Sequence, residues 1–264
     1  MNKRFLLIGI ICFLLPITLQ VVDKNRQYSV IDTYQKEVEE QEEDTLVACF
    51  EHAKAYNKTL YELKKSSVGQ DVTLDYSNQL NVTSTGMMGH LEIPKINLNL
   101  PIYHGTSEDV LTTGIGHLEG TSLPVGGENV HTVLTGHCGL PSAQLFTRLD
   151  EIKEGDHFTL HICNQKLEYE VNEIRIVKPD QVDVIAIEEG KDQASLITCT
   201  PYGINTHRLI VTGERIEETE KETAEMTAEG GVDEKIYNIM GIGTLFFLLF
   251  ICRCINRKFR YFDK

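Results

Sequence analysis

The stretch Leu196-Ile-Thr-Cys-Thr-Pro-Tyr-Gly-Ile-Asn-Thr-His-Arg208 places one cysteine at the end of an apolar, β-prone run and an arginine nine residues later. Cysteine attacks as the thiolate, and a free thiol with a pKa of about 8.5 is only slightly ionised at neutral pH. Cys199 therefore needs a partner that favours its ionised form, and Arg208 supplies a cation. The stretch predicts two β-strands joined by a turn, with a nucleophile at the end of the first.

A second stretch, Val133-Leu-Thr-Gly-His-Cys-Gly-Leu-Pro-Ser-Ala-Gln-Leu-Phe146, contains another apolar run, which stops at Gly136 and is followed directly by His137. An imidazole can act as a general acid or base near neutral pH. We therefore predict that His137, Cys199 and Arg208 come together from three strand ends as a catalytic site.

Short β-prone runs separated by Gly, Pro and Asn continue from residue 91 onward. Examples are Leu91 to Ile96, Val130 to Thr135, His157 to Cys163, Leu167 to Ile176, Ala194 to Cys199 and Leu209 to Thr212. This spacing predicts an all-β barrel or sandwich. Asn164-Gln165, between two alternating runs, predicts a hairpin turn in which Asn164 adopts the left-handed conformation.

The two motifs resemble those of the sortase family, the cysteine transpeptidases of Gram-positive cell surfaces. The family signature is T-L-x-T-C, followed by an arginine and preceded by a T-G-H histidine, and the matching residues here are Leu196-Ile-Thr-Cys199 and Thr135-Gly-His137. The resemblance covers residues 86–216. It is closest to the class C, pilus-assembling sortases, because the long strings T-C-T-P-Y-G-I-N-T-H-R and G-H-x-G-L-P-S-A-x-L-F are far more specific than a lone T-x-T-C.

The resemblance implies a closed eight-stranded sortase-type β-barrel with short helices over residues 86–216. It implies that Cys199 is the nucleophile, that His137 is the catalytic histidine and that Arg208 completes the site. The implied activity is cleavage of an LPxTG-like sorting signal between Thr and Gly through a Cys thioester. The acyl group then passes to a lysine amine of the next pilin subunit, so that pili are polymerised, and no metal or cofactor is expected.

Two alternatives remain open. The first is a sortase that anchors surface proteins bearing an LPxTG-like signal to the amine of a cell-wall precursor. The second is a catalytically inactive, membrane-tethered binding protein, which the presence of all three site residues disfavours.

Apolar runs lie near both ends of the chain, each beside basic residues. They predict an N-terminal transmembrane anchor over residues 1–22 and a C-terminal transmembrane helix over residues 236–254, followed by a basic cytoplasmic tail at 255–264. By the positive-inside rule, this two-pass arrangement in the cell membrane places the catalytic domain outside the cell.

Between the anchors, residues 23–85 predict an α-helical extension followed by a lid-like loop, because apolar residues first recur at helical spacing and then give way to Ser, Gly, Asp and Asn. Residues 217–235 form an acidic linker. The net charge of −14 argues against nucleic acid as a partner, since binding phosphates requires a basic surface.

Pilus sortases often carry a lid, an Asp-Pro-aromatic segment that covers the active site. The region Lys64 to Tyr76 contains no such tripeptide. We therefore expect no lid of that kind. Asp71-Val72 and Asp75-Tyr76 are the two possible substitutes, since an acid beside an apolar residue could pair with Arg208 and cover the nucleophile.

Four cysteines lie between the predicted membrane segments: Cys49, Cys138, Cys163 and Cys199. An even set of four allows three disulfide pairings in an oxidising compartment. Cys138 stands where the pilin-type relatives usually carry an arginine. Formation of a disulfide, tuning of the site and no role at all are three open interpretations of this cysteine.

Overall fold

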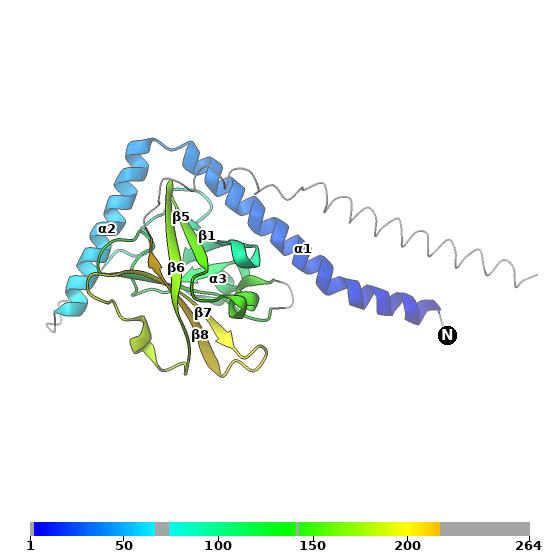
Figure 1. Ribbon diagram of the computed structural model, residues 1–264. Helices are drawn as coiled ribbons and strands as arrows, with labels where there is room; N and C mark the ends of the chain where they lie inside the picture. Colours follow the sequence, from blue (N-terminus) through cyan, green and yellow to red (C-terminus); the bar gives the residue numbers. More distant parts are fainter. Residues whose placement is uncertain (1–2, 67–73, 141–142, 217–264) are drawn as a thin grey trace, which may run out of the picture. The chain divides into compact units, whose positions relative to one another are not determined.

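The computed structural model describes residues 3–66, 74–140 and 143–216. Two long helices, α1 (Lys3–Glu39) and α2 (Glu43–Lys65), precede a closed barrel of eight strands (Figure 1). The strands are β1 (Met87–Ile93), β2 (Leu98–His104), β3 (Ile115–His117), β4 (Val130–Thr135), β5 (His157–Ile162), β6 (Gln165–Val177), β7 (Asp192–Thr200) and β8 (His207–Arg215). Short helical segments lie between them: η1 (Pro94–Ile96), α3 (Glu108–Thr113), η2 (Leu145–Glu151) and η3 (Val182–Ile185). The predicted eight-stranded barrel is confirmed.

The order of strands around the barrel is β1-β2-β3-β4-β7-β8-β6-β5, and β5 pairs with β1 to close it. The pairs β2/β3 and β4/β7 are parallel, whereas the other pairs are antiparallel. A parallel pair cannot be joined by a tight hairpin and needs a longer crossover connection. The crossover from β4 to β7 contains β5 and β6, so two strands far apart in the sequence become neighbours.

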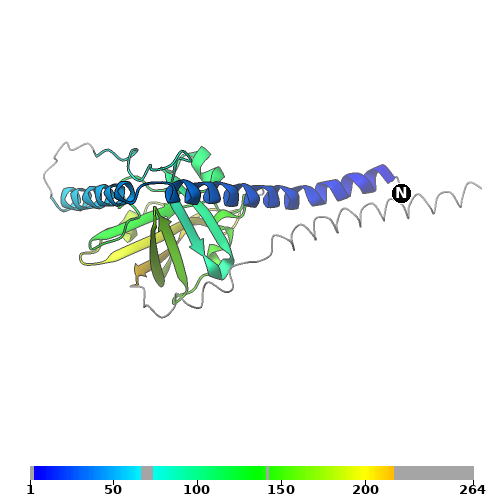
Figure 2. The same ribbon diagram turned by 90° about the horizontal axis from the view of Figure 1, so that it is seen from above.

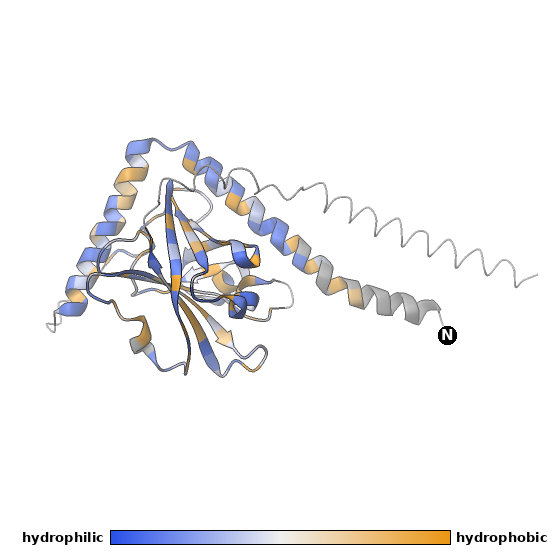
Figure 3. Ribbon diagram, in the orientation of Figure 1, coloured by the Kyte–Doolittle hydropathy of each residue, from blue (hydrophilic) through white to orange (hydrophobic). Residues whose placement is uncertain are grey.

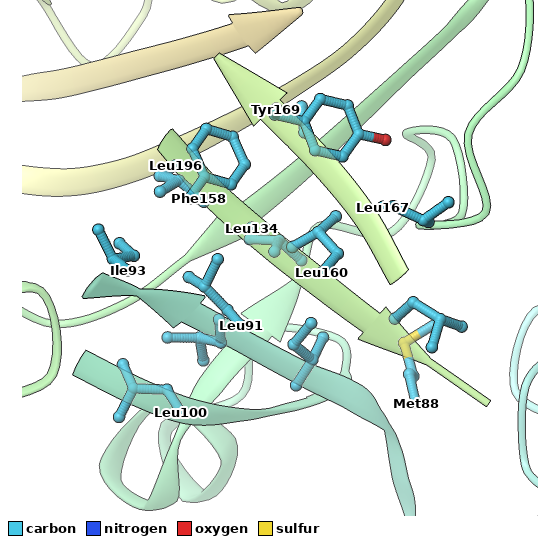
Figure 4. Close-up of a cluster of buried hydrophobic side chains, with 14 of the residues drawn as sticks. Met88, Leu91, Ile93, Leu100, Leu134, Phe158, Leu160, Leu167, Tyr169 and Leu196 are labelled. Carbon is cyan, nitrogen blue, oxygen red and sulfur yellow. The ribbon is translucent and has the colours of Figure 1, made fainter. Parts of the chain in front are cut away.

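The interior of the barrel is filled by the apolar side chains that alternate along the strands. On β5, Phe158 and Leu160 are at most 1% exposed, whereas Thr159 between them is less buried. Leu91, Leu134 and Leu196 meet them from other strands and are all fully buried (Figure 4). Burial of each such side chain stabilises the fold by about 2 kcal/mol. The packed interior gives the strand ends fixed positions.

The turn between β5 and β6 differs from the sequence prediction by one residue. The two strands pair with Ile162 opposite Gln165, so the turn consists of Cys163 and Asn164. Cys163, with φ of 52°, is the residue in the left-handed region, and the prediction that Asn164 takes this conformation is wrong. The register of the strands, set by burial of alternate residues, decides where the turn falls.

The two N-terminal helices pack against the barrel through buried polar contacts, and the predicted helical extension is confirmed (Figures 1 and 2). The Tyr34 hydroxyl on α1 donates a hydrogen bond of 3.1 Å to the Met88 carbonyl on β1. On α2, the Asn57 amide donates to the Leu123 carbonyl at 3.0 Å and accepts from the Leu123 N–H at 2.7 Å. These bonds satisfy polar groups that burial would otherwise leave unpaired.

Helix α2 buries one side. Leu46, Ala53 and Leu60 recur at seven-residue intervals, about two helical turns, and all three are buried. The other positions carry mostly polar and charged residues, with hydrophobic residues such as the half-exposed Val47 among them (Figure 3). The amphipathic pattern in the sequence therefore reflects packing of this helix.

The N-terminal apolar run forms the first part of a helix that continues into polar sequence. Helix α1 extends for 37 residues from Lys3 to Glu39 across the predicted boundary at residue 22. In the described parts of the chain, no helix combines the length and apolarity of a membrane span. The predicted acidic linker, C-terminal transmembrane helix and cytoplasmic tail lie outside the described residues.

The segment that follows the lid-like loop is anchored inside the fold. Tyr76 is 7% exposed, and its hydroxyl lies 2.9 Å from His117 Nδ1 and accepts a 2.9 Å bond from the Gly105 N–H. The Asp75 carboxylate accepts hydrogen bonds from Asn78. Asp75-Tyr76 is therefore not a substitute lid over Cys199, because its side chains are engaged elsewhere. Asp71-Val72 lies outside the described residues.

Two buried histidines make the stability of the fold dependent on pH. Burial lowers the pKa of His117 to about 4, and burial together with the nearby charge of His161 lowers the pKa of His90 to about 4. The unfolded chain binds these protons near pH 6.5, so between pH 6.5 and pH 4 the unfolded state holds more protons than the folded state. This contribution to stability is complete above pH 6.5 and is lost as the pH falls towards 4.

We expect the free energy of unfolding to fall by about 1 kcal/mol per pH unit for each of these histidines across that range. Urea unfolding at pH 7 and pH 5 measures the difference. In the variant His117→Gln, the free energy of unfolding should fall less between pH 7 and pH 5, because one of the two buried histidines is gone. His52→Gln, on an exposed part of α2, is the control and should behave like the wild type. An unchanged pH dependence in His117→Gln would contradict this account.

Candidate active site

Cys199 and Arg208 lie directly opposite each other on neighbouring strands. Cys199 is close to the end of β7, Arg208 is close to the start of β8, and their Cα atoms are register partners in the antiparallel pair. Side chains of directly opposed residues project from the same face of a sheet, with Cβ atoms about 5 Å apart. The nine-residue spacing in the sequence thus becomes one cross-strand pair.

His137 reaches this pair from the end of β4. Strand β4 runs parallel to β7, with Thr135 beside Ile197. The attachment continues one residue further, because the Gly136 N–H donates to the Ile197 carbonyl at 3.1 Å and the Thr198 hydroxyl donates to the Gly136 carbonyl at 2.8 Å. His137 follows Gly136 and Cys199 follows Thr198, so the two residues come directly after the contact that joins the ends of β4 and β7.

The residues before His137 and Cys199 are suited to these positions. A Cβ atom at Gly136 would lie 2.7 Å from the ring of Phe146, so a larger residue would displace that buried ring. Thr198 is 4% exposed, and its hydroxyl hydrogen bond is the contact that joins the two strand ends. The T-G-H and T-C strings are thus the two sides of one close contact between strands.

The His137 ring is partly exposed and faces an acidic side chain. Its Nε2 lies 3.6 Å from Oε1 of Glu108, the first residue of α3. That distance is an ion-pair contact when the ring is protonated and is longer than a hydrogen bond. Among the described residues, Nε2 has no hydrogen-bond partner. Glu108 is therefore a charged neighbour of this nitrogen and not its hydrogen-bond partner.

The Arg208 guanidinium is held by carbonyl groups. Nη1 donates to the His207 carbonyl at 3.1 Å and to the Asn205 carbonyl at 3.4 Å. Within residues 3–66, 74–140 and 143–216, no carboxylate forms an ion pair with it. The cation therefore keeps donors for an oxyanion or a carbonyl group.

Cys138 is a free thiol beside the site, as is Cys199. Burial raises the pKa of the Cys138 thiol, and the charges of Asp150 and Cys199 raise it further. A raised pKa keeps Cys138 protonated and weakly nucleophilic at neutral pH. Of the two neighbouring cysteines, Cys199 is the one opposite a cation.

An exposed apolar rim borders the strand ends. Tyr202 and Ile204, in the loop between β7 and β8, are 65% and 67% exposed. The Tyr202 ring contacts Gly139, where an added Cβ would lie 3.0 Å from the ring and where φ is +85°. Gly139 thus permits the loop after β4 and the loop after β7 to come close together near Cys199.

The structure brings together the three residues that the sequence predicted, at the adjoining ends of β4, β7 and β8. Glu108 was not predicted from the sequence. An acidic residue directly after Ser107 is typical of the first turn of any helix, so no local signal marks it as a neighbour of His137.

Comparisons with known proteins agree with this geometry. The model of the sortase domain matches residues 91–216. The crystal structure of sortase C1 from Streptococcus agalactiae is 49% identical, with a TM-score of 0.66, and the match covers 72% of this chain and 98% of that one. For sortase C from Streptococcus pneumoniae the identity is 46%, with the same TM-score and coverage.

A curated relative, sortase D of Bacillus subtilis, is 36% identical over 131 residues, which are 48% of this chain and 63% of that protein. The chain thus spans a little less than two thirds of sortase D but nearly the full length of the two crystal structures. On the strength of the domain match, the high identity to these structures and the shared barrel, the chain belongs to the sortase family, with class C sortases as structural neighbours.

Proposed function

We propose that this sortase assembles pili as a cysteine transpeptidase. It cleaves an LPxTG-like sorting signal of a pilin subunit between Thr and Gly and transfers the acyl group to a lysine amine of the next subunit. The observation that carries the proposal is the pairing of Cys199 with Arg208 across β7 and β8, beside His137. Support for the substrate class comes from the Streptococcus pneumoniae sortase C, whose crystal structure is described as giving insight into pilin substrate specificity.

In the first step, the Cys199 thiolate attacks the carbonyl carbon of the threonine. The carbonyl oxygen becomes an oxyanion, and Arg208 donates hydrogen bonds to it from a side chain that no carboxylate of the described chain neutralises. A planar guanidinium offers several donors in fixed geometry, whereas an ammonium group offers only a point charge.

The tetrahedral intermediate then collapses. The bond between threonine and glycine breaks, His137 in its protonated form donates a proton to the departing glycine amine, and a thioester on Cys199 remains. In the second half, the neutral His137 accepts a proton from the incoming lysine amine, which attacks the thioester. The thiolate leaves and an isopeptide bond joins the subunits.

Glu108 assists as a positioning residue. A carboxylate 3.6 Å from His137 Nε2 restricts the orientation of the imidazole ring. The side chain of Glu108 is 77% exposed, so this contribution is small.

The partners in this proposal are pilin subunits at a cell membrane. The apolar sequence segments 5–22 and 236–252, each beside basic residues, support attachment there. The second candidate acceptor is a cell-wall precursor amine, the alternative that the sequence resemblance leaves open. Incubating the full chain with pilin and with lipid-linked precursor peptide distinguishes them: covalent pilin ladders support the proposal, and transfer to the peptide alone contradicts it.

The variant Cys199→Ala should lose thioester formation and ladder formation, by about 10³-fold or more, because no other group in the site can carry the acyl chain. Trapping with hydroxylamine and gel analysis of pilin products measure both steps. Cys138→Ala is the matched control and should remain active. Polymerisation by Cys199→Ala would refute the assignment of the nucleophile.

The variant Arg208→Lys should lose about 10- to 100-fold in kcat although the charge is kept, since the loss of one oxyanion donor typically costs that much or more. Steady-state cleavage of a fluorescent LPxTG-like peptide measures the rate. Arg175→Lys, on exposed β6 sequence, controls for a general effect of the substitution. Wild-type turnover in Arg208→Lys would mean that Arg208 is peripheral.

The variant Glu108→Gln should reduce kcat by about two- to fivefold with little change in KM, because a largely exposed ion pair is worth at most about 1 kcal/mol. Asp109→Asn is the matched control: it removes the same charge from the same turn of α3, and in the described residues Asp109 forms no ion pair. Equal effects of the two variants would show that Glu108 acts only through the negative charge of the first turn of α3, and not through its contact with His137.

A further inference from the structure

Four segments of the chain meet at a buried junction away from the active site. We call Tyr34 of α1, Cys49 of α2, Leu80 and Cys163 the extension junction. Tyr34 is 1% exposed and Leu80 is fully buried. The Tyr34 hydroxyl accepts a 2.9 Å hydrogen bond from the Cys163 N–H and donates to the carbonyl of Met88. At this point the helical extension touches the turn between β5 and β6.

The junction holds two thiols side by side. The side chains of Cys49 and Cys163 are hydrogen-bond partners, and the Leu80 N–H donates a second hydrogen bond to Cys49. Both cysteines are free. Cys163 is 8% exposed, whereas Cys49 is partly exposed and packs against the core, so a reagent reaches the pair from the side of Cys49.

The two thiols are chemically unequal. The hydrogen bond from Cys163 lowers the pKa of Cys49, and the same bond, together with burial, raises the pKa of Cys163. Cys49 is therefore the member of the pair that ionises first. A thiolate beside a protonated partner thiol is the arrangement in which one cysteine attacks a disulfide and the other resolves it.

The backbone at the junction supports a specific role for Cys163. Leu80 has φ of 55° and Cys163 has φ of 52°, in the left-handed region that side chains other than Gly, Asn and Asp seldom occupy. At a two-residue hairpin turn, Asn or Gly would adopt that conformation more easily. Turn chemistry therefore does not explain a cysteine at position 163, whereas its contact with Cys49 does.

We propose that Cys49 and Cys163 form a disulfide site that ties α2 covalently to the barrel. The oxidant is a disulfide, either a small molecule or a protein. The Cys49 thiolate attacks one of its sulfur atoms and expels a thiolate, which takes up a proton. Cys163 then loses its proton and attacks the sulfur of Cys49 in the mixed disulfide, and the second thiol of the oxidant leaves. Two protein thiols are oxidised and one disulfide is reduced to two thiols.

The bond would close a loop of more than one hundred residues between α2 and the β5–β6 turn. Such a cross-link removes many conformations from the unfolded chain, so it stabilises the attachment of α2 to the barrel. The active-site cysteine is not consumed. The inference stands independently of the proposed function.

The test uses the full chain with its native cysteines. The protein is incubated with oxidised glutathione, free thiols are blocked with N-ethylmaleimide, and the chain is digested with trypsin without reduction. Mass spectrometry should find tryptic peptide 37–54, which contains Cys49, joined to peptide 154–166, which contains Cys163. The species should disappear on reduction and in Cys49→Ser, and it should persist in Cys138→Ser. Separate alkylation of the two cysteines after oxidation, or pairing of either one with another cysteine, overturns the proposal.

Thermal unfolding gives a second readout. The oxidised chain should unfold at a midpoint about 5–10 °C above that of the reduced chain. The double variant Cys49→Ser/Cys163→Ser should show no such difference between oxidising and reducing conditions. If the cross-linked peptides form but the midpoint does not rise, the bond is not a tether and the proposal fails. The peptide map on the wild-type chain decides the question even if a variant does not fold.

Discussion

The parallel pairing of β4 with β7 is the constraint on which the candidate site depends. It brings together two strand ends that are 62 residues apart in the sequence, as measured between Gly136 and Thr198, and joins them by a buried hydroxyl hydrogen bond of 2.8 Å. His137 and Cys199 each follow directly. Strand β8 adds Arg208 from the other side of β7. The three groups therefore need no long loops for positioning, because the barrel itself holds them.

Six of the eight strands, all except β2 and β3, could be predicted because their signals are local, and so could the three candidate site residues at strand ends. Alternating burial defines a strand from its own residues, and the T-G-H and T-C strings end their strands at the same edge. The contacts of Tyr34, Asn57 and Tyr76 could not be predicted in this way. Each depends on a partner more than thirty residues away. The length of α1 could not be predicted either, because an apolar run does not show whether its helix continues into the polar sequence that follows.

Cysteine occupies contrasting environments in this chain. Cys199 lies opposite a cation at an open strand end, whereas Cys163 lies in a turn under two helices, where the hydrogen bonds of its backbone and thiol are satisfied within the protein. The same side chain is thus partly exposed in one place and buried in the other. Burial and the charge of the neighbour, and not the residue type, separate these environments.

The position of β7 and β8 at the end of the barrel sequence has a consequence for folding. Contacts between distant parts of a chain form slowly, because a long loop must close before they stabilise anything. During synthesis His137 and its strand are made long before Cys199, and Arg208 is made last. Cys199 lies opposite Arg208 only when the last strand has docked, so a barrel that lacks β8 does not contain the assembled candidate site.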